Sequence, residues 1–329
     1  MKILVTGGAG FVGSHVIDAY LAAGHEVVAI DDLSTGRREN VNSRARLLEM
    51  DIRDPALLDL FDRERFEVVC HQAARGNVRA SLENPYIYAD VNVRGGINIL
   101  EACQKTGVRK IIYSSTGGCV YGELQYLPAD ENHPIRPRDP YGASKASFEL
   151  YLNVYEMTYG LRFTILRYPN IYGPRQDPYG EAGVVSIFTG KMLGGLQAVI
   201  NGDGDQQRDY VYAEDAARAN LLALDRGDNE VFNLGWGFGV SVNQIFRELK
   251  TLTGYSLPEV HGPPMAGEVR LSYLQADKAR VGLGWEPKVP LEQGLRETVD
   301  YFSQLLPVSG TGPGSSGNPS IGAGVPPRD

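Results

Sequence analysis

The chain has 329 residues and a formal net charge of −8; 43% of its residues are hydrophobic and 22% are charged. This composition is typical of a soluble globular protein large enough for about two domains. The acidic balance argues against a dedicated nucleic-acid binder, because neutralising phosphates requires clustered Lys and Arg. No apolar run approaches the roughly 20 residues that cross a bilayer, so we expect no membrane partner.

The cysteines indicate a reducing compartment. They are odd in number and lie in apolar contexts, which is typical of buried free thiols: Cys70, Cys103 and Cys119. Residues 1–5 form an apolar strand pattern that runs into a glycine-rich turn, so no signal peptide is expected. We therefore expect a cytoplasmic protein.

The first half alternates short apolar runs, rich in β-branched residues, with longer helix-like patterns. The predicted strands are Ile3–Thr6, Val27–Ile30, Arg46–Met50, Val68–His71, Lys110–Ser115 and Phe163–Arg167. The predicted helices are Gly13–Ala23, Pro55–Phe61, Val91–Thr106 and Tyr141–Thr158. Strand–helix alternation of this kind predicts an α/β fold of Rossmann type, a doubly wound parallel sheet with helices on both faces.

From about residue 169 the pattern changes, because Pro and Gly become frequent and the alternation weakens. Short helices are predicted at Val184–Leu193, Ala213–Leu224, Val242–Thr253 and Leu291–Gln304. We expect a sheet domain over residues 1–168 and a smaller α/β domain over residues 169–306, with segments that cross between them. Residues 307–329 are almost all small, polar or Pro, so we predict a disordered tail.

A glycine-rich turn follows the first strand. The segment is Gly7-Gly8-Ala9-Gly10-Phe11-Val12-Gly13. Gly7, Gly10 and Gly13 fit the dinucleotide-binding spacing G-x-x-G-x-x-G, and Gly8, Gly10 and Gly13 fit the spacing G-x-G-x-x-G. Such a turn lets the backbone approach a pyrophosphate at a helix N-terminus. The next strand is followed by Asp31, whose carboxylate would accept hydrogen bonds from ribose hydroxyls and repel a 2′-phosphate. The sequence therefore predicts NAD rather than NADP as cofactor.

A second group of residues points to proton transfer. Tyr141 and Lys145 are four residues apart at the start of a predicted helix, so both lie on one face. A nearby ammonium would lower the pKa of a tyrosine and favour its phenolate. Hydroxyl residues end the strand at Ser114-Ser115-Thr116, the end where parallel sheets bind ligands. Either Thr116 or Ser115 could hydrogen-bond a substrate oxygen while Tyr141 transfers its proton.

Together with Val120-Tyr121-Gly122, these motifs resemble the extended short-chain dehydrogenases/reductases, and within them the NAD-dependent epimerase/dehydratase family of sugar-nucleotide enzymes. The resemblance covers residues 1–304. It implies that Thr116, third in its hydroxyl run, is the catalytic alcohol; the spacing to Val120 is one residue longer than in some members, which keeps Ser115 as the alternative. Asp51 could lie near the adenine or be a solvated loop acid. The cofactor residues that the resemblance implies are Gly7, Gly10, Phe11, Val12, Gly13, Asp31, Asp32, Asp51, Ile52, Gln72, Ala73, Ala74, Asn92, Ser114, Tyr141, Lys145 and Tyr168.

For the substrate, the resemblance implies contacts from Thr116, Tyr141, Asn170, Arg208, Arg270 and Ser272. Arg208 is the expected diphosphate ligand. The family usually has an arginine shortly before a Gly-Asp/Glu pair, where this chain has Met265, so Arg270 is expected to serve instead. The resemblance also places Ser272 at the position whose size governs tolerance of a 2-N-acetyl group, where a small residue would leave room for that group. No metal site is predicted, since the histidines show no ligand spacing.

The resemblance implies a UDP-sugar substrate and 4-epimerisation, by transient oxidation at C4, that interconverts UDP-glucose and UDP-galactose. UDP-glucuronate and UDP-N-acetylglucosamine remain alternative substrates. A dehydratase is less expected, because Gly117-Gly118 stand where those enzymes carry an acid pair after the catalytic alcohol. A non-catalytic NAD-binding regulator is also less expected, given Tyr141 and Lys145. The resemblance further implies a homodimer formed through the helices predicted at Val91–Thr106 and Tyr141–Thr158.

Overall fold

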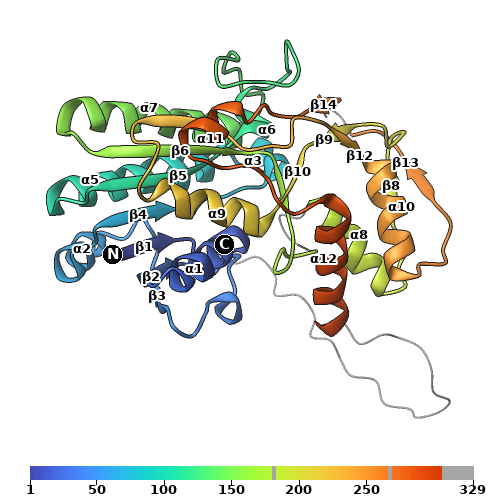
Figure 1. Ribbon diagram of the computed structural model, residues 1–329, viewed down its shortest axis with the longest axis horizontal. Helices are drawn as coiled ribbons and strands as arrows, with labels where there is room; N and C mark the ends of the chain where they lie inside the picture. Colours follow the sequence, from blue (N-terminus) through green and yellow to red (C-terminus); the bar gives the residue numbers. More distant parts are fainter. Residues whose placement is uncertain (180–182, 266–268, 306–329) are drawn as a thin grey trace.

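The computed structural model describes residues 1–179, 183–265 and 269–305. Its centre is a seven-stranded sheet in the order β11-β6-β5-β4-β1-β2-β3, and every neighbouring pair is parallel (Figure 1). The strands of this sheet are β1 Lys2–Thr6, β2 Glu26–Asp31, β3 Arg46–Glu49, β4 Val68–His71, β5 Lys110–Thr116, β6 Arg162–Tyr168 and β11 Glu230–Asn233. The order reverses at β1, which lies between β2 and β4, so the predicted Rossmann-type fold is confirmed.

Alternating side chains of the strands bury themselves in two layers. Ile3 and Val5 of β1 pack against one group of helices, whereas Leu4 packs against the other. The first layer contains α1 Phe11–Ala22 and α9 Ala213–Ala223; the second contains α2 Leu57–Glu64, α5 Gly96–Thr106 and α7 Pro140–Tyr159. Because β5 is buried along its whole length, its last residues reach the sheet edge in a fixed position.

The predicted strands and long helices of the first half are confirmed, with ends that shift by up to three residues. One helix differs. The pattern over Val91–Thr106 predicts a single α-helix, but residues Ala89–Gly95 form a π-helix that leads into α5. Wider π turns of this kind often occur at functional sites. The short elements α3 Val78–Glu83, α4 Pro85–Tyr88, α6 Gly117–Val120 and the 3-10 turn Arg38–Asn40 have no clear periodicity and were not predicted.

Residues beyond 168 return to the main sheet. Helix α9 packs on the same face as α1 (Figure 1), and β11 pairs with β6. Trp285, which follows α11 Asp277–Gly282, is buried in the same layer. Segments of the second half of the chain thus add a strand and helices to the main sheet of the first half. A domain boundary at residue 168 stays a prediction. The predicted tail over 307–329 lies outside the described residues.

A second group of elements packs beside the sheet, at the right in Figure 1. Helices α8 Val184–Leu193, α10 Val242–Thr253 and α12 Leu291–Leu305 enclose one apolar cluster. Three small sheets lie near them, formed by β7 Asn170–Tyr172 with β10 Tyr210–Tyr212, by β8 Val199–Asn201 with β13 Val260–Gly262, and by β9 Gln207–Arg208 between β12 Val240–Ser241 and β14 Leu271–Ser272. The predicted helices of this half are confirmed within one residue. Strands of two or three residues carry no readable period and were missed.

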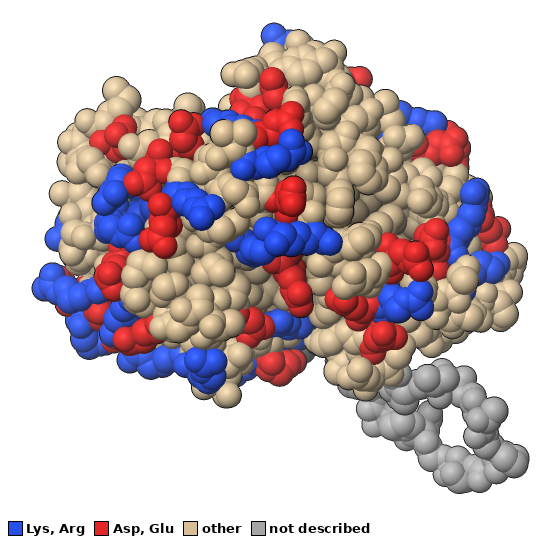
Figure 2. All heavy atoms as spheres, viewed as in Figure 1, with Lys and Arg blue, Asp and Glu red and all other residues tan. Residues whose placement is uncertain are grey.

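Charged side chains of both signs are interspersed on the face shown in Figure 2. Among the described residues, no helix combines the length and apolar character needed to span a bilayer.

Candidate functional site

The glycine-rich turn between β1 and α1 brings the backbone against the loop after β4. Gly7 has a φ of +67°, and a Cβ there would lie 2.6 Å from the backbone nitrogen of Ala73. A Cβ on Gly13 would lie 2.1 Å from the carbonyl oxygen of Gly7. Gly8 instead faces the core, against the Ala29 side chain. The structure therefore favours the spacing that starts at Gly7, with Gly10 as the N-cap of α1.

Asp31 ends β2 beside this turn. Its carboxylate accepts hydrogen bonds from the backbone nitrogens of Ala9, at 3.0 Å, and Leu33, at 2.9 Å. Burial raises the pKa of Asp31, and these amide donors oppose that rise. Each carboxylate oxygen keeps a second lone pair for a ribose hydroxyl. A 2′-phosphate in the same place would meet like charge.

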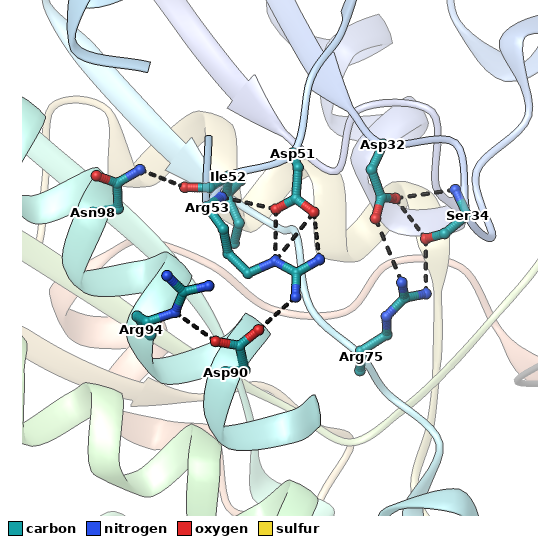
Figure 3. A network of polar contacts seen from close by, with 9 residues as sticks. All are labelled: Asp32, Ser34, Asp51, Ile52, Arg53, Arg75, Asp90, Arg94 and Asn98. Atoms are coloured by element: carbon teal, nitrogen blue, oxygen red, sulfur yellow. Dashed lines mark hydrogen bonds and ion pairs between the residues drawn. The ribbon is translucent and has the colours of Figure 1, made fainter. Parts of the chain in front are cut away.

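Two groups of polar contacts lie close to this turn, one around Asp51 and one between Asp32 and Arg75 (Figure 3). Asp51 accepts hydrogen bonds from the backbone and guanidinium of Arg53, which lowers the pKa of Asp51. Arg53 also bonds Asp90 at 2.5 Å. Asp32 accepts from Ser34 and lies 3.5 Å from Arg75, so the loops after β2 and β4 touch across the cleft. Asp51 is therefore a fixed carboxylate in the cleft wall, not a freely solvated loop acid.

One cleft runs along the carboxyl edge of β1, β2 and β4. Its lining is Gly7, Gly10, Ile30, Asp31, Asp32, Ser34, Thr35, Met50, Asp51, Ile52, Gln72, Ala73, Ala74, Arg75 and Val91. A close glycine approach, a helix N-terminus and a carboxylate after the second strand fit the pyrophosphate and ribose of a dinucleotide. Nine of the predicted cofactor residues lie in this lining.

Helix α7 presents the predicted acid–base pair. Pro140 occupies its first turn, and Asp139 caps it by accepting from the Gly142 nitrogen at 2.7 Å. Lys145 is buried; its Nζ donates to the Ser114 carbonyl oxygen at 2.7 Å and lies 4.8 Å from the centre of the Tyr113 ring. Tyr141 lies one turn earlier and lines a cavity, next to α7's first turn. The helix thus carries the phenol of Tyr141 one turn before a buried ammonium that is held by the end of β5.

The three hydroxyl residues at the end of β5 have different surroundings. Ser114 donates to the Tyr168 hydroxyl at 2.9 Å, and Ser115 donates to Glu149 at 2.5 Å. Thr116, the last residue of β5, lines the same cavity as Tyr141. Between the two sequence alternatives, this geometry favours Thr116 as the alcohol that meets a substrate, because the Ser115 proton is already committed.

Two adjoining cavities share Val78, Arg79, Thr116, Pro169 and Asn170. One continues past Phe11, Ser115, Tyr141, Tyr168 and Gln176; the other continues past Cys119, Arg138, Asp139, Arg208, Met265 and Ser272. Arg208 and Ser272 are register partners on β9 and β14. The structure thus brings Thr116, Tyr141, Asn170, Arg208 and Ser272 to one connected space.

Six predicted residues line neither the cleft nor the two cavities: Val12, Gly13, Asn92, Ser114, Lys145 and Arg270. Two of them have contacts that differ from the expected role. Arg270 is exposed, and its guanidinium bonds both Asp203 oxygens at 2.8 Å, so it does not line the cavity of Arg208. Asn92 is buried in the π-helix, where its amide bonds the Arg75 backbone and Ser144. It fixes the loop behind the cofactor cleft and does not line the cleft. Met265 does line the substrate cavity, whereas the Gly267-Glu268 pair lies outside the described residues.

Sequence reasoning missed several lining residues. Arg79 on α3 and Arg138 before α7 both reach the substrate cavity, and Arg75 reaches the cofactor cleft. Asn220 on α9 is fully buried and donates to the Tyr168 hydroxyl at 2.6 Å. Arg75 directly follows the predicted residues Gln72, Ala73 and Ala74, whereas Arg79 and Asn220 lie outside every motif and reach their positions through tertiary packing.

Two further groups near the site are neutral. Burial, and secondarily the charge of Lys145, lower the pKa of His71 to about 3. Burial also raises the pKa of the Cys119 thiol to about 12. Neither is therefore a base or nucleophile near neutral pH. The described ranges contain no group of three His, Cys, Asp or Glu side chains arranged to hold a metal ion.

Comparison with known proteins agrees with this geometry. Residues 3–235 match the NAD dependent epimerase/dehydratase family. A UDP-glucose 4-epimerase of Mycolicibacterium smegmatis is 41% identical over 309 residues, covering 92% of this chain and 98% of that protein. The Thermotoga maritima UDP-glucose 4-epimerase structure with UDP-glucose has a TM-score of 0.91 at 50% identity, covering 93% and 99% of the two chains. The Thermus thermophilus enzyme in complex with NAD has a TM-score of 0.89 at 44% identity, covering 93% and 100%.

Proposed function

The chain belongs to the NAD-dependent epimerase/dehydratase family, and from this membership we propose that it is a 4-epimerase that interconverts UDP-glucose and UDP-galactose. One observation carries the proposal beyond the family. Thr116, Tyr141 and Asn170 line a single cavity, and Arg208 lines the part that adjoins it. Relatives that are 41–50% identical bear the same enzyme name.

The residues of the cleft fit NAD as the cofactor. Gly7, Gly10 and Gly13 allow the backbone to approach the pyrophosphate, and Asp31 would bind the adenosine ribose. The chemistry that bound NAD supplies is reversible oxidation at C4 of the hexose.

The chain's own residues would manage the proton. Tyr141, as phenolate, would take the proton of the sugar 4-hydroxyl and later return it, and Thr116 would hydrogen-bond the same oxygen. Lys145 would favour the phenolate through its positive charge. Arg208 would bind the diphosphate and hold the nucleotide while the hexose turns to present its other face.

A dehydratase is disfavoured by the same cavity. Elimination of water needs a carboxyl group beside the sugar, and the position after Thr116 is Gly117. Among the described residues that line the two cavities, Asp139 is the one with a carboxylate, and its oxygen caps α7. Ser272, next to Arg208, leaves UDP-N-acetylhexoses as second candidate substrates.

The test is incubation of the purified protein with UDP-galactose, UDP-glucuronate and UDP-N-acetylgalactosamine in turn, without added NAD. We expect the C4 epimer of UDP-galactose as product. Absence of epimer from all three sugars would overturn the proposed function, and full dependence on added NAD would overturn a retained cofactor.

We also propose a homodimer. Leu150, Val154 and Met157 form an exposed apolar stripe on α7, at helical spacing. Helix α5 packs closely beside α7, where a Cβ on Gly96 would lie 2.4 Å from Phe148. Sedimentation at micromolar concentration should give a dimer, and Val154→Glu should give a monomer. A monomeric native protein would refute the proposal.

We propose a cytoplasmic location as well. All three cysteines are free, and Cys70 and Cys103 are buried, which suits a reducing compartment. Cell fractionation tests this, and recovery outside the cytoplasm would contradict it.

A further inference from the structure

A buried ion pair lies directly behind the proposed catalytic residues. Arg167 on β6 donates two hydrogen bonds to Glu149 on α7, at 3.0 and 2.6 Å, and both residues are at least 96% buried. Arg167 also donates to the Tyr121 hydroxyl at 2.8 Å, and Tyr121 donates to Asn233 on β11. Every polar group of the pair therefore has a partner, as a buried pair requires.

Glu149 continues the row that begins with the acid–base pair. Tyr141, Lys145 and Glu149 are spaced four residues apart, so they lie along one face of α7. That face meets the end of β5, where Lys145 bonds the Ser114 carbonyl and Glu149 accepts from the Ser115 hydroxyl. Thr116 follows at the cavity. Consecutive residues of β5 are thus tied to consecutive turns of α7.

Arg167 extends these contacts to the neighbouring strand. It directly precedes Tyr168, which lines the cavity, and lies three residues before Asn170. The Glu149–Arg167 pair therefore joins the helix that carries Tyr141 to the strand end that carries the proposed cofactor and substrate contacts.

We propose that Glu149, through Arg167 and Ser115, is a positioning residue for the epimerase reaction: it sets where α7 holds Tyr141 and Lys145 relative to Thr116. This inference rests on the proposed function. The side chains of Glu149 and Arg167 would act without contacting the substrate, since both are buried behind the end of the strand. A displacement of about 1 Å between reacting groups lowers the rate on the order of 100-fold, so a small shift of α7 relative to β5 is enough to affect turnover.

The test compares two paired variants. Glu149→Gln with Arg167→Gln removes both charges together, which avoids an uncompensated buried charge. The matched control is Lys110→Met with Asp228→Asn, an ion pair of 2.6 Å with a fully buried lysine at the opposite end of β5. We expect the first variant to lower kcat roughly 10- to 100-fold with little change in KM. We expect the control to lower only the thermal unfolding temperature.

A second readout does not depend on turnover. Formation of the Tyr141 phenolate is measured as the difference in ultraviolet absorbance between a protein that carries Tyr141 and its Tyr141→Phe variant. The measurement covers the pH range below that in which ordinary tyrosines titrate. If Lys145 is displaced, the Tyr141 titration should move to higher pH in the Glu149/Arg167 variant and stay unchanged in the control. Other titratable groups close to these residues are His71 near Lys145, Tyr113 near Glu149 and Tyr141, and Tyr121 near Arg167; burial lowers the pKa of His71 and raises the pKa values of Tyr113 and Tyr121. The Tyr88 ring also lies 6.5 Å from the Tyr141 ring.

The outcomes separate the two proposals. A folded double variant with native kcat and native titration would overturn the positioning role, as would equal loss of kcat in the control. If the double variant does not fold, Ser115→Ala should show a smaller change in the same direction, and no change would overturn the role. If the native protein epimerises no UDP-hexose, the proposed function fails, while the titration still tests the position of Lys145.

Discussion

Gly13 offers the sharpest test of the dinucleotide cleft. A Cβ at this position would lie 2.1 Å from the Gly7 carbonyl oxygen and 3.1 Å from the Gly8 Cα. Since both are backbone atoms, no side-chain rotation can relieve the contact. Gly13→Ala must therefore separate α1 from the turn by about 1 Å before the contact becomes ordinary. We expect overpacking to lower the free energy of unfolding by about 1–3 kcal/mol.

The same displacement moves the amides that face the pyrophosphate. The purified native protein should retain NAD, which is released by acid and assayed enzymatically, and Gly13→Ala should retain little. The control is Gly107→Ala, at the end of α5, where a Cβ meets nothing within 4 Å but the φ is +75°. It should cost about 1 kcal/mol of stability through the left-handed backbone and keep its NAD. A Gly13→Ala protein with a native NAD content would refute the reasoning.

Three further predictions follow from particular contacts. Tyr141→Phe should lower kcat by roughly 10²- to 10⁴-fold with unchanged NAD content, and near-native turnover would exclude Tyr141 as the acid–base group. Arg208→Ala should weaken UDP binding by about 10- to 100-fold in calorimetry, whereas Arg270→Ala, whose guanidinium bonds Asp203, should change it little; the reverse order would contradict the placement. Hydrogen bonds from Arg46, Lys2 and Arg63 lower the pKa of Glu64 from 4.5 to about 2. The contribution of the Glu64 carboxylate to the free energy of unfolding is therefore present above pH 4.5 and is lost as the pH falls toward 2. Glu64→Gln should cost about 1–2 kcal/mol at pH 7, allowing for the exposed partners, and a gap that persists at pH 2 in chemical denaturation would disprove this linkage.

The cofactor cleft could be predicted from the sequence because its residues follow the strands directly. Gly7, Gly13 and Asp31 lie within one strand–helix–strand unit, so chain order alone brings them together. The long helices could be predicted as well, since each buries one face, except that the π-helix Ala89–Gly95 replaces the first part of the helix predicted at Val91–Thr106. By contrast, β11 was not predicted, because Glu230–Asn233 is short and is separated from its neighbour β6 in the chain by helices and strands of the second group.

Side-chain direction is what the sequence left open. Arg270 has the residue type that the cavity needs and lies two residues before Ser272, yet Asp203, 67 positions away, holds its guanidinium outside. Arg79 reaches the cavity from a six-residue helix that has no predicted pattern. In both cases a contact between distant segments decides the outcome.

The choice between Ser115 and Thr116 shows how structure resolves what a motif cannot. Successive residues of a strand point to opposite faces, so Ser114 meets Tyr168 on the α9 side while Ser115 meets Glu149 on the α7 side. Each of these hydroxyls already donates its proton inside the protein. Thr116 is the last residue of the strand and lines both cavities. In this run of three hydroxyl residues, the first two fix the strand between its helix layers. The third, which also hydrogen-bonds the Cys119 thiol, is the one that we propose meets a ligand.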